Sequence, residues 1–155
     1  MSEYSKAYFK DIAERTKKNL EKYQGEYDTT QLINSTIGLI IIPKEKCYKK
    51  IKDSLVKQDL LDKLRTAITD NTYPEDGEII ALKDIIKHIR NGIAHGNIYF
   101  DAENGEIKRV IIEDHKKAYL DKPKADFSIN IDEADLRDFM IEFAEAIIKN
   151  NIIAE

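Results

Sequence analysis

The stretch Lys-His-Ile-Arg-Asn-Gly-Ile-Ala-His-Gly at residues 87–96 closes a segment, residues 78–95, with clear helical spacing. On a helical wheel at about 100° per residue, the apolar side chains of this segment form one stripe, made of Ile79, Leu82, Ile86, Ile89 and Ile93. We expect this stripe to face the protein's own core. Gly96 stands where a helix commonly ends. The pattern therefore predicts an amphipathic helix, the third major helix of the chain.

Polar residues form a second stripe on nearly the opposite side of this predicted helix: Asp84, His88, Asn91 and His95. A histidine packed into the core of its own subunit would share the apolar stripe, and His95 does not. Arg90 lies between the two stripes, and its long side chain can swing toward His95. Two interpretations stay open on these grounds. The stripe is either a chemical site or a solvated face whose last histidine stabilises the helix dipole.

Helical spacing also predicts helices at residues 3–23, 29–42 and 58–68, and a last helix that follows Asp132. The helix at residues 29–42 is apolar on nearly every side, which is typical of a central, buried element. Pro43 then ends or kinks it. Asp132 is the expected N-cap of the last helix. The apolar face of that helix consists of Leu136, Phe139, Met140, Phe143 and Ile147.

A lysine-dense stretch follows Pro43 and consists of Lys44, Lys46, Lys49, Lys50 and Lys52. One interpretation is a patch that faces phosphate groups. The other is a solvated helix face, whose charge is balanced by Glu45 and Asp53. The sequence pattern leaves both open.

Beyond Gly96 the hydrophobic period changes from helical to alternating. Residues 97–100 and 106–112 flank Asn104-Gly105, which is a strong hairpin signal. A third strand is expected at residues 126–131, and the composition of residues 69–77 indicates a loop. We therefore predict a mainly α (α+β) fold in one domain of residues 1–155. It is a helical bundle with a small antiparallel hairpin or three-stranded sheet inserted before the last helix.

Composition narrows the classes of function. With 155 residues, 42% of them hydrophobic and 35% charged, the chain fits one soluble globular domain. The formal net charge of −4 argues against a nucleic-acid binder that relies on bulk positive charge, although it leaves room for a local basic site. The polar N-terminus is unlike a secretory signal, and the longest apolar run, residues 37–42, is too short for a membrane span. We expect a cytoplasmic protein that does not contact membranes.

The cysteine and the histidines do not indicate a metal centre. A single cysteine, Cys47, rules out an internal disulfide and a multi-thiolate zinc site. The three histidines (His88, His95 and His115) do not form a short metal-ligand pattern such as HExxH. Cys47 is expected to be a buried or semi-buried small residue, and His115 is assigned no role. We therefore predict no metal site and no cofactor.

Two segments carry a resemblance to a known family. The run Arg-Asn-Gly-Ile-Ala-His at residues 90–95 matches the signature of HEPN domains, an arginine and a histidine separated by four to six residues, with a polar residue directly after the arginine. Residues 32–45 read LINSTIGLIIIPKE and resemble a plasmid-associated HEPN subfamily. In that subfamily an Asn-Ser-x-x-Gly-Leu…Pro-Lys-Glu run precedes the motif by a similar interval. The resemblance covers residues 29–100.

The resemblance implies a HEPN-like helical bundle that pairs as a homodimer and brings two motifs together at the interface. Active HEPN domains are metal-independent endoribonucleases, so RNA is the implied substrate. The roles in phage defence, toxin–antitoxin pairs or stress responses imply an antitoxin or sensor protein as a further partner. The implied catalytic residues are Arg90, Asn91 and His95. Weaker candidates for substrate binding are Lys87, His88 and Asn97, although His88 is also explained as a solvated or interface histidine.

RNA cleavage without a metal fits these residue types. A base must take the proton of the 2′-hydroxyl, and an acid must protonate the 5′-oxygen as it leaves. Imidazole, with an ordinary pKa of about 6.5, serves in either role near neutral pH. Arg90 would hold the scissile phosphate. Asn91, one turn before His95, would orient the imidazole or bind the phosphate.

Two alternatives to a ribonuclease remain at this point. One is a HEPN domain that binds RNA, a nucleotide or a protein without cutting. The other is a structural dimer module unrelated to HEPN domains. Some HEPN toxins carry a tyrosine two residues after the histidine, where an antitoxin modifies them. Here that position is Asn97, and the nearest tyrosine is Tyr99, so this form of regulation is not expected.

Overall fold

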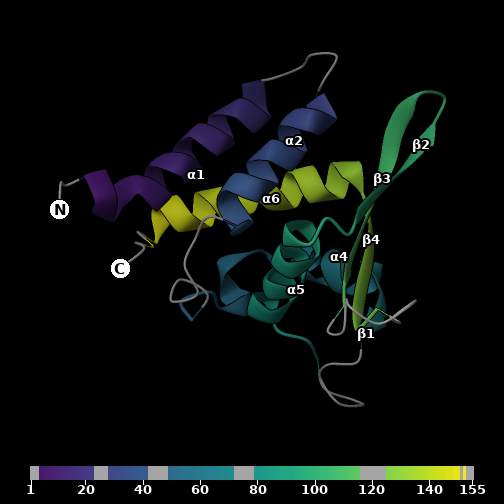
Figure 1. Cartoon of the computed structure of the whole chain (residues 1–155). Coiled ribbons are helices and arrows are strands. Elements are labelled where there is room, and N and C mark those ends of the chain that lie inside the picture. The colour runs from purple at the N-terminus through teal and green to yellow at the C-terminus, as the bar shows by residue number, and fades with distance from the viewer. Residues whose placement is uncertain are drawn as a thin grey trace.

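The computed structural model describes residues 4–22, 28–41, 49–71, 79–115, 125–150 and 152 (Figure 1). In these ranges the α-helices are α1 (Tyr4–Lys22), α2 (Asp28–Thr36), α4 (Gln58–Ala67), α5 (Leu82–Ala94) and α6 (Glu133–Lys149). A π-helical turn, η1 (Ile37–Ile41), follows α2, and a 3₁₀ turn, η2 (Asp53–Leu55), precedes α4. The strands are β1 (Ile68–Asn71), β2 (Ile98–Glu103), β3 (Glu106–Asp114) and β4 (Phe127–Asp132). The predicted α+β class is confirmed.

Three helices form the layer in the upper part of Figure 1. Helices α1 and α2 lie side by side, and α6 crosses behind them and contacts both. Lys17 of α1 lies 3.2 Å from Glu145 of α6, and this hydrogen bond raises the pKa of Lys17 above its usual value. The apolar face predicted for α6 is confirmed, because every residue assigned to it is buried. None of the described helices combines the length and the apolar character needed to cross a membrane.

The predicted central helix at residues 29–42 is formed by α2 and η1. Its side chains at Leu32, Leu39 and Ile40 are buried, as expected. The winding changes from α to π after Thr36, whose hydroxyl donates to the Leu32 carbonyl oxygen at 2.9 Å. A side chain that bonds back to the preceding turn competes with regular helical bonding. The sequence pattern predicted the helix but not this change of winding.

The lysine-dense stretch is described only in part, because residues 42–48, which include Pro43 and Cys47, lie outside the described residues. Lys49, Lys50 and Lys52 are exposed. Their exposure fits both interpretations of the stretch, the solvated face and the phosphate-facing patch.

The described strands form one antiparallel sheet in the order β1-β4-β3-β2. The predicted hairpin is confirmed, since β2 pairs with β3 and both residues of its turn, Asn104 and Gly105, have positive φ, 53° and 79°. The predicted number of strands was wrong: the sheet has four strands, and β1 lies partly in the segment predicted to be a loop. Three of the four β1 residues are exposed. A short, exposed edge strand has no apolar alternation to reveal it, and pairing with β4 determines its conformation.

Strands β3 and β4 form the buried part of the sheet. In the second half of β3 every second residue is buried, and these residues pair with buried residues of β4: Val110 with Ile131, Ile112 with Ile129, and Asp114 with Phe127. Helices α5 and α6 both contact β3. Five of these six residues are apolar, as a core requires. The sixth, Asp114, places a carboxylate at the end of the row.

Helix α5 begins four residues later than predicted, at Leu82. Ile79 is therefore not part of the apolar stripe and is 76% exposed, whereas Leu82, Ile86 and Ile89 are buried as expected. Ala81 at the N-cap position offers no side-chain acceptor. The carboxylate of Asp53 takes that role from the η2 turn, since it accepts a hydrogen bond from the Leu82 backbone N–H at 2.8 Å.

Replacing Asp53 by alanine is expected to lower the free energy of unfolding by about 1–2 kcal/mol, because it removes the acceptor at the start of α5. The same carboxylate also pairs with Arg65 at 3.0 Å. Urea denaturation checks the value, and Asp53→Asn, which retains one acceptor oxygen, is expected to lose less. Equal midpoints for wild type and Asp53→Ala would contradict the assignment of this carboxylate as the cap.

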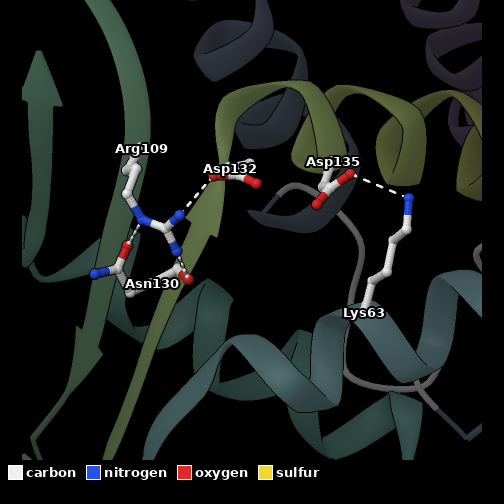
Figure 2. A network of polar contacts seen from close by, with 5 residues as sticks. All are labelled: Lys63, Arg109, Asn130, Asp132 and Asp135. Atoms are coloured by element: carbon white, nitrogen blue, oxygen red, sulfur yellow. Dashed lines mark hydrogen bonds and ion pairs between the residues drawn. The ribbon is translucent and has the colours of Figure 1, made fainter. Parts of the chain in front are cut away.

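Asp132 does not cap α6 in the predicted way. It occupies the N-cap position, but its side chain makes no capping hydrogen bond. Its carboxylate instead accepts a hydrogen bond from Arg109 at 2.5 Å, and Arg109 also donates to the side-chain and backbone oxygens of Asn130 (Figure 2). In the same view Lys63 of α4 lies 3.4 Å from Asp135 in the first turn of α6. The Arg109 guanidinium on the neighbouring strand thus binds the Asp132 carboxylate, which the sequence predicted to be the N-cap of α6.

Candidate functional site

The Arg-x4-His segment forms the C-terminal part of α5. Arg90 and Asn91 are half-buried, and His95 is exposed at the C-cap position. The His95 backbone N–H donates to the Asn91 carbonyl oxygen at 3.0 Å. His95 therefore remains the helical neighbour of Asn91, one turn further on.

The backbone after His95 confirms the predicted cap. Gly96 has a φ of +74°, its N–H donates to the Ile93 carbonyl at 3.0 Å, and the Asn97 N–H donates to the Gly92 carbonyl at 2.8 Å. These two bonds define a Schellman motif, in which glycine at the left-handed position ends the helix. The cap fixes the His95 backbone at the surface, so the position from which the imidazole extends is well defined.

Asp114 joins two residues of the polar stripe. Its Oδ2 lies 2.7 Å from Nδ1 of His88 and 3.1 Å from Nδ2 of Asn91. An ionised carboxylate only accepts hydrogen bonds, so both nitrogens act as donors. Asp114 is 9% exposed, and a buried charge requires such partners. The carboxylate thus ties the middle of α5 to the end of β3.

Phe127 completes the surroundings of His88. The two rings stack with centroids 4.6 Å apart and planes inclined by 7°. Phe127 and Asp114 are paired residues of β4 and β3, so one cross-strand pair both stacks on the imidazole and accepts its N–H. The His88 side chain is only 16% exposed. The His88 side chain therefore packs on the sheet, against β3 and β4.

Gly92 permits the close approach of α5 to β3. A Cβ atom at this position would lie 2.5 Å from Cγ2 of Ile112 and 2.7 Å from the backbone oxygen of Glu113. These separations are well below van der Waals contact, so only glycine fits the present packing. The short distance between helix and strand is what brings His88 and Asn91 within reach of Asp114.

The structure corrects the prediction for the polar stripe. His88 and Asn91 do not face away from their own subunit, because Asn91 contacts β3 and His88 contacts both β3 and β4 of the same chain. The solvated interpretation of His88 was therefore wrong, since its side chain is only 16% exposed. The wheel identifies only the more apolar side of a helix, and here the sheet covers part of the other side as well. His95 alone of the three is exposed.

The two weaker candidates, Lys87 and Asn97, flank in the chain the residues that α5 supplies to this cluster. Lys87 is exposed, and Asn97 is half-buried, with its backbone oxygen accepting from the Glu113 N–H at 3.0 Å. His115 lies 2.9 Å from the Glu113 carboxylate. In the described part of the chain, no group of three His, Cys, Asp or Glu side chains is arranged to hold a metal ion.

Sequence reasoning missed Asp114 and Phe127. The signal for Asp114 was present, since it continues the inward alternation of Val110 and Ile112 in β3. An acidic residue at an inward-facing position requires a buried partner. The identity of that partner depends on the packing of α5 against the strand, which the local pattern does not contain.

A second polar region lies between α4, β4 and the start of α6. It is an open cleft of about 410 Å³ whose charged lining residues are Asp59, Asp62, Lys63, Arg109, Asp132 and Asp135. Lys63 and Arg109 already pair with carboxylates of this group (Figure 2). No residue of the 87–97 segment lines the cleft, so it is separate from the Arg-x4-His site.

Comparison with known proteins identifies a family. The family model described as HEPN pEK499 p136 matches residues 1–153. No curated protein and no solved structure matches this chain. The matched range contains both segments that carry the sequence resemblance, together with the sheet and α6.

Proposed function

This chain belongs to the HEPN pEK499 p136 family, and we propose that it is a metal-independent endoribonuclease that acts as a homodimer. The resemblance to HEPN domains seen in residues 29–100 is thereby confirmed and extends over nearly the whole chain. The proposal for this member depends on its own residues, above all on Arg90 and His95.

The placement of His95 is the observation that carries the proposal. It is exposed at the capped end of α5, five residues after the half-buried Arg90, whereas His88 and His115 are both engaged by carboxylates of their own chain. An exposed imidazole with a fixed backbone can reach a substrate. An always-charged guanidinium on the preceding turns can bind its phosphate.

The chemistry requires two proton-transfer groups. One imidazole takes the proton of the 2′-hydroxyl, and the oxygen attacks the neighbouring phosphorus. A second, protonated imidazole gives its proton to the departing 5′-oxygen. Arg90 stabilises the additional negative charge on the phosphate in the transition state. The products are a 2′,3′-cyclic phosphate and a 5′-hydroxyl.

One subunit has one histidine suited to this task. A two-fold dimer with its axis near residues 91–95 supplies two copies of His95 and two of Arg90. Ala94, His95 and Gly96 are all exposed, which leaves this end of α5 accessible to a second copy. We therefore propose that the active site is formed between two subunits.

Cleavage is expected to persist in EDTA and to stop when the nucleotide at the cut site is 2′-deoxy, because the nucleophile is then missing. The pH–rate profile is expected to be bell-shaped, since one His95 must be neutral while its mate is protonated. Gel analysis of mixed RNAs, with end-group mapping of the fragments, measures each point. Cleavage of the deoxy substrate, or activity lost in EDTA and restored by Mg²⁺, would refute the mechanism.

A second candidate is a HEPN module that binds RNA, a nucleotide or a protein without cutting. The net charge of −4 favours a nucleotide or a protein over RNA as the ligand of such a module, since many RNA-binding surfaces depend on positive charge. RNA binding without cleavage under all conditions would establish this alternative. For either activity we propose action in the cytoplasm, in phage defence, a toxin–antitoxin pair or another stress response, with an antitoxin or sensor protein as partner.

A further inference from the structure

The Asp114 carboxylate is a buried charge that contacts the Arg-x4-His motif directly. Its Oδ2 accepts hydrogen bonds from Asn91 at 3.1 Å and from His88 at 2.7 Å. The His88 ring, which is the second donor, is itself held in place by burial and by stacking on Phe127. The carboxylate therefore has a defined position relative to α5.

This arrangement fixes which way the Asn91 amide points. A carboxylate offers no donor, so Asn91 must turn its Nδ2 toward Asp114, and the amide oxygen Oδ1 is left for a different donor. His95 is one helical turn further along the same side of α5, and residues four apart on a helix are neighbours. The backbone bond from the His95 N–H to the Asn91 carbonyl maintains that relation up to the cap.

We propose that Asp114 is a positioning residue of the ribonuclease site and acts on His95 through Asn91. Asp114 holds the Asn91 amide, and the exposed His95 side chain turns so that the Asn91 Oδ1 accepts the N–H of one of its ring nitrogens. The other ring nitrogen is then directed to the RNA for proton transfer. This inference rests on the proposed function for its catalytic consequence, while the link from Asp114 to His95 is a property of the folded chain.

A purely structural role for Asp114 makes a different prediction. If the carboxylate only joins α5 to β3, its replacement lowers stability and affects catalysis in the same way whether or not Asn91 is present. If it acts through Asn91, the two substitutions are not additive. The chain offers a matched control on the same strand: Glu113, the preceding residue, also pairs with a histidine, His115, at 2.9 Å.

A double-mutant cycle with Asp114→Asn and Asn91→Ala tests the proposal. In the wild-type background Asp114→Asn is expected to lower kcat by up to about 10²-fold with little change in KM, because a misplaced catalytic group costs rate and not binding. In the Asn91→Ala background it is expected to cost less than about threefold. Glu113→Gln is expected to change neither constant. Equal losses from Asp114→Asn in both backgrounds would overturn the proposal.

The nitrogen NMR signals of the imidazole rings provide a readout that does not depend on activity. Asp114→Asn and Asn91→Ala are expected to shift the His95 ring nitrogens in the same direction, and Glu113→Gln is expected to shift only those of His115. Unchanged His95 signals in Asp114→Asn would overturn the inference even if the protein cuts RNA. Linked shifts in a protein that cuts no RNA would support the link to His95 and reject the proposed function.

A second variant keeps the test decisive if Asp114→Asn does not fold, as judged by circular dichroism. His88→Phe retains a ring against Phe127 and removes only the N–H that Asp114 accepts. It is expected to shift the His95 signals in the same direction as Asp114→Asn and to lower kcat by less than about tenfold. A folded His88→Phe with wild-type His95 signals would contradict the proposal.

Discussion

Replacing His95 by alanine is expected to reduce RNA cleavage by about 10²–10⁴-fold, the usual effect of losing a proton-transfer group. Arg90→Ala is expected to reduce it about as much, because a preorganised charge on the scissile phosphate is lost. Both variants should remain folded, since His95 is exposed and Arg90 is only half-buried. Single-turnover cleavage of a labelled RNA, with circular dichroism of each variant, measures both effects.

The control for this prediction is His88, the histidine that lies within α5. His88→Ala is expected to reduce cleavage by less than about tenfold, because its ring is already engaged by Asp114 and Phe127 of its own chain. Arg90→Lys is expected to recover little activity, since an ammonium group does not reproduce the bidentate hold of a guanidinium on phosphate. Equal losses for His88→Ala and His95→Ala would show that the catalytic histidine has been misidentified.

Mixed dimers extend the same test to the shared site. A dimer of one wild-type and one His95→Ala subunit contains a single motif histidine, so it lacks either the base or the acid. Excess His95→Ala protein is therefore expected to suppress wild-type cleavage by exchange of subunits. Activity that stays proportional to the wild-type protein present would place a complete site within one subunit.

The fold could be predicted from the sequence wherever a local pattern determines the structure. The Asn104-Gly105 turn, the Gly96 cap and the buried face of α6 are examples, because each depends on residues close together in the chain. The start of α5 and strand β1 were not predicted correctly. Both depend on partners distant in sequence: Asp53 for the helix N-terminus and β4 for the strand.

The candidate site likewise has one part that the sequence predicted and one part that it did not. The spacing of Arg90 and His95 and the exposure of His95 follow from one helix and its cap, so the sequence was sufficient to find them. The surroundings of His88 and Asn91 were misjudged, because a helical wheel has no information on a sheet that packs against the more polar side. Asp114 lies 26 residues after His88 in the chain, and only the packing of α5 on β3 joins them.

That packing should be highly sensitive to substitution at Gly92. Gly92→Ala is expected to lower the free energy of unfolding by about 1–3 kcal/mol through overpacking, although alanine favours a helix over glycine by about 1 kcal/mol. The added methyl group meets the Glu113 backbone oxygen at 2.7 Å, and a backbone atom cannot rotate away as a side chain can. Urea denaturation measures the loss.

Gly38→Ala in η1 is the matched control, because its added Cβ would meet only Cγ2 of Ile12 at an ordinary contact distance of 3.6 Å. It is expected to change stability by less than about 0.5 kcal/mol. Gly92→Ala should also lower cleavage in molecules that remain folded, since α5 must move away from β3 and Asn91 then leaves Asp114. If Gly92→Ala matched Gly38→Ala in stability and kept full activity, the close contact of α5 with β3 would not be what positions the site.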